Sequence, residues 1–439
     1  MYLSQQLVVI SINIMAPKHE AMTRCNMYKK KPVLLIFPFE QLAHYLRCIT
    51  LAQRLSPYFE IRFAASERYQ SFIAASGFET FPCDAMDVDE VAACVKRFDF
   101  SWINRNNLER AFNSQVAVIT KWQPAAVLGD AMPTLNMAAE KSGVPFISLL
   151  NGYMTRHYSE VRTMSWRHPL YAWFRFLPAP VLNALTKQGE AVTFRAIHKP
   201  FQELRRQYGL LKKFSYADEL EGTLNLICDV PELFPQQPLP KNHQWIPPLI
   251  YQPAGQSHQV VTKLDASKQT LFVSMGSTGD WAQVLFLNDP FFQQYNIVTA
   301  GDAAHVVHGP EVIRTDFVNI EPLFKHIDLV LCHGGNGTIY QALLYGIPLL
   351  CKTAHFEQEW NVQALEKNGL GASLDAVDDT IEYQEIIAAW MHKKHTAPFI
   401  ALQKAITDAA QWEPAIARIL ELVPSVREMP YYEQERNSA

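Results

Sequence analysis

Short apolar runs alternate with segments of helical periodicity along the first half of the chain. The run at residues 32–39 (PVLLIFPF) is typical of a buried strand, and apolar positions three or four residues apart then predict a helix over 44–55. The alternation continues with predicted strands at 60–65, 78–82, 125–129, 144–150 and 223–229 and predicted helices at 68–75 and 133–142. This order is characteristic of βαβ units, so we expect a parallel sheet.

A Pro-rich stretch with weak periodicity, from about 231 to 267, separates this half from a second one. The alternation then restarts, with predicted strands at 271–274, 296–299, 312–317, 329–332 and 347–351 and predicted helices at 337–345, 358–368, 381–394 and about 398–422. Each half therefore predicts a doubly wound α/β unit. The expected divisions are a tail (1–28), an N-terminal Rossmann-like domain (29–250), a linker (251–268), a C-terminal Rossmann-like domain (269–411) and a terminal segment (412–439).

Residues 153–213 differ from the rest of the first half. They are helical in pattern and rich in aromatic residues, and they carry eleven Lys and Arg against three Glu. One interpretation is that these helices cover the sheet and line a binding pocket. The alternative is a membrane-surface patch, which would give the protein a peripheral membrane contact near a lipid or other hydrophobic substrate.

Composition excludes several classes of protein. The 439 residues are 49% hydrophobic, which suffices for packed cores and excludes disorder as the main state. The net charge of −4 gives no basic signature, so we expect no nucleic-acid partner. No apolar run is long enough to span a bilayer. Widely spaced cysteines without a C-x-x-C pair argue against a disulfide framework or a structural zinc site and favour a reducing, cytoplasmic location; they are Cys25, Cys48, Cys83, Cys94, Cys228, Cys332 and Cys351.

The most informative segment begins where the predicted strand at 329–332 ends. His333 follows it, and the glycine-rich turn 334–338 (GGNGT) then opens a helix. A helix N-terminus leaves backbone N–H groups unpaired and carries partial positive charge, and glycines let that backbone approach an anion. We interpret the turn as a diphosphate site, to which His333 and Thr338 add side-chain hydrogen bonds.

A second polar cluster favours this interpretation over a tight turn without a ligand. Glu357 and Gln358 follow the next predicted strand, and Asn361 comes one helical turn later. They are expected at the same carboxyl edge of the sheet, where open α/β sheets bind their ligands.

Together the segment reads HGGNGTIYQALLYGIP and then EQEWN. It resembles the nucleotide-sugar signature of the GT-B glycosyltransferases of family 1, the UDP-glycosyltransferase and macrolide-glycosyltransferase group. The resemblance covers about residues 32–410 and is strongest over 271–371. It implies an α/β, GT-B fold of two Rossmann-like domains facing across a cleft. The implied donor is a nucleotide sugar, with UDP as the expected nucleotide and dTDP and GDP as alternatives.

The resemblance also implies particular donor contacts. Phe317 would stack on the base, although a core aromatic at a strand end is the alternative. Gln341 stands where the family has a ribose-binding Glu, and an amide binds hydroxyls less strongly than a carboxylate. The implied donor-binding residues are Ser277, Phe317, Val318, His333, Gly335, Asn336, Gly337, Thr338, Gln341, Glu357 and Gln358.

Residues 38–52 (PFEQLAHYLRCITLA) resemble the family loop that carries the general base. His44 has the family spacing, while Ala43 and Arg47 stand where the family has Gly and Pro. Neither change removes the imidazole, and the Pro acts mainly on conformation. By resemblance, His44 would deprotonate an acceptor hydroxyl, and Asp130 at the end of a strand would orient it.

The implied reaction is an inverting displacement, from a nucleotide sugar to a hydroxyl of a small, rather hydrophobic acceptor. Neither a metal nor a cofactor is expected, because no D-x-D motif is suitably placed and residues 375–379 (DAVDD) are interpreted as a helix-capping segment. Residues 412–428 are expected to cross back to the first domain.

Two alternative functions remain. One is a nucleotide-sugar 2-epimerase, and the other is a non-catalytic glycosyltransferase-like helper. The replacement of the family Glu by Gln341 is the one hint of the helper.

Overall fold

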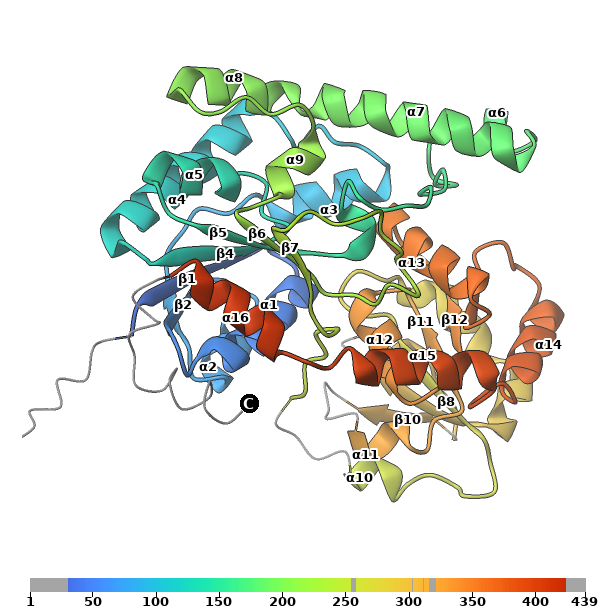
Figure 1. Ribbon diagram of the computed structural model, residues 1–439. Coiled ribbons are helices and arrows are strands. Elements are labelled where there is room, and N and C mark those ends of the chain that lie inside the picture. Colours follow the sequence, from blue (N-terminus) through green and yellow to red (C-terminus); the bar gives the residue numbers. More distant parts are fainter. Residues whose placement is uncertain (1–30, 254–257, 302, 311, 316–320, 424–439) are drawn as a thin grey trace, which may run out of the picture. The chain divides into compact units, whose positions relative to one another are not determined.

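The computed structural model describes residues 31–253, 258–301, 303–310, 312–315 and 321–423, so the expected tail lies outside the described residues. Two parallel sheets organise this part of the chain (Figure 1). The first is seven-stranded, in the order β3-β2-β1-β4-β5-β6-β7. Its strands are β1 (Val33–Pro38), β2 (Glu60–Ala64), β3 (Glu79–Phe81), β4 (Ala126–Asp130), β5 (Phe146–Leu150), β6 (Leu224–Ile227) and β7 (His243–Trp245).

Helices cover both faces of the first sheet because its central strands are apolar on both sides. In β1, Leu34 and Ile36 join the core that contains α1, whereas Leu35 and Phe37 join the core that contains α4 and α5. The helices of this half are α1 (Leu42–Leu55), α2 (Gln70–Ala75), α3 (Val88–Lys96), α4 (Arg105–Trp122), α5 (Leu135–Ser142), η1 (Gly152–Met154), α6 (Tyr171–Phe174), α7 (Ala179–Ile197), α8 (Lys199–Tyr208) and α9 (Tyr216–Leu220).

The second sheet is six-stranded, in the order β10-β9-β8-β11-β12-β13. Its strands are β8 (Thr270–Ser274), β9 (Asn296–Ala300), β10 (Val312–Thr315), β11 (Leu329–Cys332), β12 (Leu349–Cys351) and β13 (Gly371–Ser373). The helices of this half are α10 (His258–Val261), η2 (Trp281–Asn288), η3 (Pro290–Gln294), η4 (Ala304–Val306), α11 (Glu321–Phe324), α12 (Asn336–Leu344), α13 (Phe356–Lys367), α14 (Thr380–Trp390) and α15 (Ala397–Asp408). In each sheet the direction in which successive strands are added reverses at one point. This topological switch point lies between β1 and β4 in the first sheet and between β8 and β11 in the second.

The chain returns to the first sheet at its end. The helix α16 (Glu413–Glu421) buries Ala415, Ile419 and Leu420 in the same core as Leu34 of β1 and Leu226 of β6. Figure 1 shows this helix beside the first sheet, after α15 has run along the second.

Several elements were not predicted. The local sequence pattern predicts no element for α3, α4, β7 and β13, and it predicts one helical stretch over 398–422, where the structure has α15 and α16. In α4, a buried stripe with helical spacing, including Leu108, Phe112 and Ile119, carries the missing signal. None of the helices in the described ranges is long and apolar enough to cross a membrane.

Candidate active site

His44 and Asp130 meet at the carboxyl edge of the first sheet. His44 lies in the first turn of α1, and Asp130 ends β4, where it pairs in register with Pro38 of β1. The Nδ1 atom of His44 lies 2.9 Å from Oδ1 of Asp130. Since Nδ1 faces the carboxylate, Nε2 is the nitrogen available to accept a proton. The structure therefore brings the two expected catalytic residues together.

The Asp130 carboxylate has a second partner that the sequence analysis missed. Arg47, one turn after His44 on α1, donates from Nε to Oδ2 (3.0 Å) and from Nη2 to Oδ1 (2.6 Å). Both Arg47 and Asp130 are buried. Burial alone would raise the pKa of Asp130, but Arg47 and His44 hold that pKa below its ordinary value. Asp130 is therefore anionic and shared between a guanidinium and an imidazole.

A pocket opens beside His44, and most of its wall is apolar or aromatic. His355, which the sequence analysis did not single out, reaches this pocket from the start of α13. Burial lowers its pKa to about 3, and the charge of Arg167 acts in the same direction. The lining residues are Phe39, Gln41, His44, Arg47, Val91, Val95, Trp102, Asp130, Ala131, Leu149, Leu150, Asn151, Met154, Tyr216, Leu220, His355 and Glu357.

The ring of His333 lies between two glycine-containing loops of the second half. A Cβ at Gly276 would come within 2.4 Å of the ring Cε1, and one at Gly335 would come within 2.4 Å of Nε2. Only glycine therefore allows both loops to close on the ring. Burial lowers the pKa of His333 to about 4, while a hydrogen bond with the Ser274 backbone acts in the opposite direction. His333 is thus neutral near neutral pH.

The N-terminus of α12 is open to a ligand at one position and tied to the first half at another. A Cβ at Gly337 would meet no heavy atom within 4 Å. By contrast, Asn336 Nδ2 donates to Asp229 Oδ1 at 3.0 Å. Thr338 and Gln341 are half-buried on the same helix, and Ser277 is exposed after β8. Unpaired N–H groups at such a helix start are suited to an anion.

Asp229 is a buried carboxyl that joins the two halves. It follows β6 and also accepts a hydrogen bond from the Gly152 backbone N–H at 2.5 Å. Burial raises its pKa to about 6, against hydrogen bonds from Gly152, Asn336 and Tyr340. Tyr340 is itself buried, and its hydroxyl accepts a hydrogen bond from the Val230 N–H at 3.1 Å.

The start of α13 is fixed by its own polar side chains. Gln358 accepts from the Ala354 N–H (2.6 Å) and donates to Thr278 Oγ1 (3.0 Å), so both ends of its amide have protein partners. Asn361 Nδ2 donates to the Gly334 carbonyl at 2.9 Å. These bonds join α13 to the loops after β8 and β11, which are the two loops that surround His333.

A chain of side chains runs from the His44 side of the pocket to Glu357. Arg47 Nη1 donates to Asn151 Oδ1, Asn151 Nδ2 donates to the Tyr153 hydroxyl (2.6 Å), and that hydroxyl donates to Glu357 Oε2 (3.4 Å). Burial raises the pKa of Glu357, whereas His44 and Arg47 act in the opposite direction. The carboxylate expected on the donor side therefore lies in the electrostatic field of the expected base.

Two of the expected donor-binding residues, Phe317 and Val318, lie outside the described residues.

The acidic segment 375–379 caps a helix with only one of its two ends. Asp379 accepts from the Ile381 and Glu382 N–H groups and caps α14, but Asp375 binds the N–H and hydroxyl of Thr353 instead.

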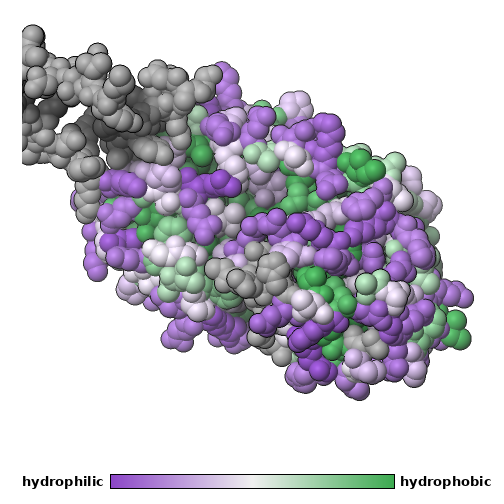
Figure 2. All heavy atoms as spheres, turned by 90° about the horizontal axis from the view of Figure 1, so that it is seen from below, coloured by the Kyte–Doolittle hydropathy of each residue, from purple (hydrophilic) through white to green (hydrophobic). Residues whose placement is uncertain are grey.

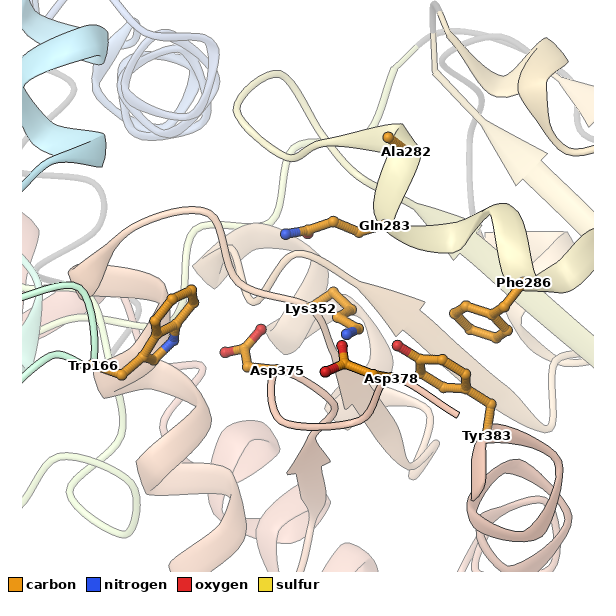
Figure 3. A pocket seen from close by; sticks show the side chains of 8 residues that line it. All are labelled: Trp166, Ala282, Gln283, Phe286, Lys352, Asp375, Asp378 and Tyr383. Carbon is orange, nitrogen blue, oxygen red and sulfur yellow. The ribbon is translucent and has the colours of Figure 1, made fainter. Parts of the chain in front are cut away.

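Asp375 also lines a second pocket, at the carboxyl ends of β12 and β13. Figure 3 shows Trp166, Gln283 and Asp375 around one side of this space, with Lys352, Asp378 and Tyr383 close together on the other. Lys352 Nζ donates to the Val377 carbonyl at 2.9 Å. The pocket shares no lining residue with the pocket beside His44.

The chain is similar to known glycosyltransferases. Residues 257–410 match the family model described as glycosyltransferase family 28 C-terminal domain. The chain is 25% identical over 355 residues to a PGL/p-HBAD biosynthesis glycosyltransferase of Mycobacterium tuberculosis, an alignment that covers 79% of this chain and 81% of the relative. It is 24% identical over 354 residues to a PGL/p-HBAD biosynthesis rhamnosyltransferase of Mycobacterium bovis, covering 79% and 77%.

Among solved structures, the spinosyn rhamnosyltransferase SpnG complexed with thymidine diphosphate superimposes with a TM-score of 0.64 at 18% identity, covering 88% of this chain and 99% of that one. The matched sequence family is family 28, so membership of family 1 stays a prediction. General glycosyl transfer is supported by the relatives. The two parallel sheets and these likenesses together show that the chain has the GT-B glycosyltransferase fold, with two Rossmann-like domains.

Proposed function

We propose that this protein is an inverting glycosyltransferase that moves a sugar from a nucleotide sugar to a hydroxyl group of a small, hydrophobic acceptor. The observation that carries the proposal is the His44–Asp130 pair, which lies in the wall of a mostly apolar pocket that Glu357 also lines. A base beside an apolar cavity is suited to an alcohol whose body is hydrophobic.

In the proposed reaction, His44 Nε2 takes the proton of the acceptor hydroxyl as its oxygen attacks the anomeric carbon. The bond from that carbon to the diphosphate breaks, and the diphosphate leaves with the electron pair. Attack opposite to the leaving group inverts the anomeric centre. The α12 N-terminus and the neutral His333 would hold the leaving diphosphate, so we assign no metal to this step.

The nucleotide is proposed to be uridine diphosphate, with thymidine diphosphate as the second candidate. Support for the class of donor comes from a structural neighbour that was solved with thymidine diphosphate and from a relative named as a rhamnosyltransferase. Glu357 is proposed to bind sugar hydroxyls, and Gln341 is proposed to bind the ribose through its amide.

We further propose a peripheral membrane contact through α6 and α7. The face in Figure 2 is mostly hydrophilic with small, separate hydrophobic patches. By contrast, α7 buries none of its residues, and Trp173 and Phe176 are 80% and 77% exposed. Exposed Arg175 and Lys187 lie among them. Aromatic and basic side chains together suit the surface of an anionic membrane, which would supply a hydrophobic acceptor.

The first test is a calorimetric titration of the full chain with UDP, dTDP and GDP, followed by a transfer assay with hydrophobic alcohols. Binding of one nucleotide, and transfer that needs an added alcohol, would support the proposal. Conversion of the nucleotide sugar without any acceptor would favour the 2-epimerase. Binding of none of the three would favour the non-catalytic helper.

A further inference from the structure

Two histidines and a glutamate from three separate segments meet at the amino edge of the first sheet. His157 follows η1, Glu221 lies between α9 and β6, and His243 begins β7. One ligand atom from each residue lies within 4.8 Å of the others. Among their side-chain atoms, Nε2 of both histidines and Oε1 of the glutamate are buried without a hydrogen-bond partner in the described part of the chain. The parallel strands place this cluster at the opposite edge from the His44–Asp130 pair, so it is separate from the proposed transfer site.

The three converging atoms are buried and have no hydrogen-bond partner among the residues that the structure describes. His243 Nε2 and Glu221 Oε1 are 3.7 Å apart, which is too long for a hydrogen bond, and the His243 side chain is fully buried. Leaving one buried polar atom unpaired costs about 1–3 kcal/mol. Three such atoms that face each other therefore point to a missing shared ligand.

The neighbouring contacts leave these particular atoms free to bind. His243 Nδ1 lies 3.1 Å from Asn242 Oδ1, so the ring proton belongs on Nδ1 and the Nε2 lone pair points to the cluster. Glu221 Oε2 pairs with Arg156 Nη2 at 3.2 Å, which leaves Oε1 for the cluster. A carboxylate or amide oxygen behind a ligating histidine is the arrangement that orients metal ligands in proteins.

We propose that His157, Glu221 and His243, the His–Glu cluster, bind one zinc ion. Two imidazoles and a carboxylate are a ligand set that zinc accepts, with a fourth position left for water. Zinc–ligand bonds of about 2.0–2.1 Å place two tetrahedral ligands about 3.4 Å apart, so the side chains must close by up to about 1.4 Å. His157 is only half-buried, which gives the ion a route from solvent. The bound ion would tie the segment after η1 to the edge strand β7.

The test uses the full chain after chelator treatment and dialysis, titrated with zinc sulfate. We expect one zinc ion per chain and a rise in the thermal unfolding midpoint, because an ion that binds only the folded state stabilises it. Cobalt(II) substitution gives a second readout, since tetrahedral cobalt absorbs visible light far more strongly than an adventitious octahedral site does. These readouts are independent of glycosyl transfer, so failure of the transferase proposal leaves them unaffected.

Two ligand variants, one variant of a positioning residue and one control make the result decisive. His157→Gln changes the half-buried ligand and is the variant that disturbs packing least, and Glu221→Gln keeps the size of the buried one. Each should weaken zinc binding by about tenfold or more, and Asn242→Ala should weaken it by about 10–100-fold. The exposed His308→Gln should bind as the wild type does. No zinc binding by the wild type, or equal binding by the wild type and His157→Gln, would overturn the proposal.

Discussion

The guanidinium of Arg47 binds both carboxylate oxygens of Asp130 through two hydrogen bonds within the buried edge of the first sheet. Arg47 also lies 3.1 Å, through Nη2, from His44 Nδ1. The proposed base is therefore oriented by a carboxylate whose charge is partly neutralised. Arg47 therefore holds in place the carboxylate that faces His44 Nδ1.

Replacing Arg47 with Met should lower both stability and activity. Asp130 would keep only His44 beside its buried charge, and we expect the free energy of unfolding to fall by about 3–5 kcal/mol. In the protein that remains folded, Arg47 no longer holds the carboxylate that orients His44, so kcat/KM should fall. Arg54→Met, an exposed change on the same helix, is the control. Equal kcat/KM in the wild type and in folded Arg47→Met would show that Arg47 does not position the base.

His44→Ala should remove transfer and leave nucleotide binding intact. A positioned general base contributes about 10²–10⁴-fold, so kcat should fall at least by that factor. Turnover and calorimetric affinity for the nucleotide are measured on the same preparation. Intact turnover in this variant would exclude His44 as the base, whereas loss of both properties would indicate a structural defect.

His333→Ala should weaken nucleotide binding. A neutral hydrogen bond contributes about 0.5–1.5 kcal/mol, which corresponds to a loss of affinity of up to about tenfold. Because burial lowers the pKa of His333 to about 4, its contribution should stay constant across the neutral pH range. His326→Ala, at an exposed position of the same half, is the matched control. Equal nucleotide affinity in the wild type and His333→Ala would contradict the phosphate contact.

Asp229→Asn tests the raised pKa of Asp229 through the pH dependence of stability. An unfolded Asp loses its proton near pH 3.9, whereas buried Asp229 keeps it to about 6. The folded state therefore binds more protons in this window, and wild-type stability should fall as pH rises from about 4 to about 6. Two pKa units correspond to about 3 kcal/mol. Urea unfolding of both proteins across this window measures the difference, and parallel pH profiles would refute it.

The proposed membrane contact predicts binding to anionic vesicles at low salt. Trp173→Ser combined with Phe176→Ser should reduce co-sedimentation, because both side chains are exposed on or next to α6. Ile381→Ser and Ile400→Ser, exposed apolar positions of the second half, provide the matched control. A wild-type protein that stays in the supernatant would end the membrane proposal.

Local sequence patterns predicted most of the central strands and the glycine-rich turn. Buried parallel strands are continuous apolar runs, such as residues 32–39, so composition alone marks them. The short strands β7 and β13 have only three residues each and lack such a run. The helix α3 was left unassigned although Asp87 caps it and Glu90 follows three residues later.

Local sequence patterns could not predict the remaining contacts of the site, because they join residues far apart in the sequence. Arg47 and Asp130 are 83 residues apart in sequence, and Tyr153 and Glu357 are 204 apart. An arginine within a helix has the same local signature whether it faces solvent or a buried carboxylate. The His–Glu cluster was missed for the same reason, because its ligands come from three segments and no motif spacing connects them.

The Tyr153 hydroxyl is bound at once by Asn151 and Glu357, and this double engagement has a thermodynamic consequence. In a transferase that works as proposed, a sugar hydroxyl that binds Glu357 would replace the Tyr153 hydroxyl as its hydrogen-bond partner. Tyr153 would then keep its bond to Asn151, which Arg47 also binds beside the base. Donor and acceptor affinities would then be linked, and each substrate would change the affinity for the other by the same factor.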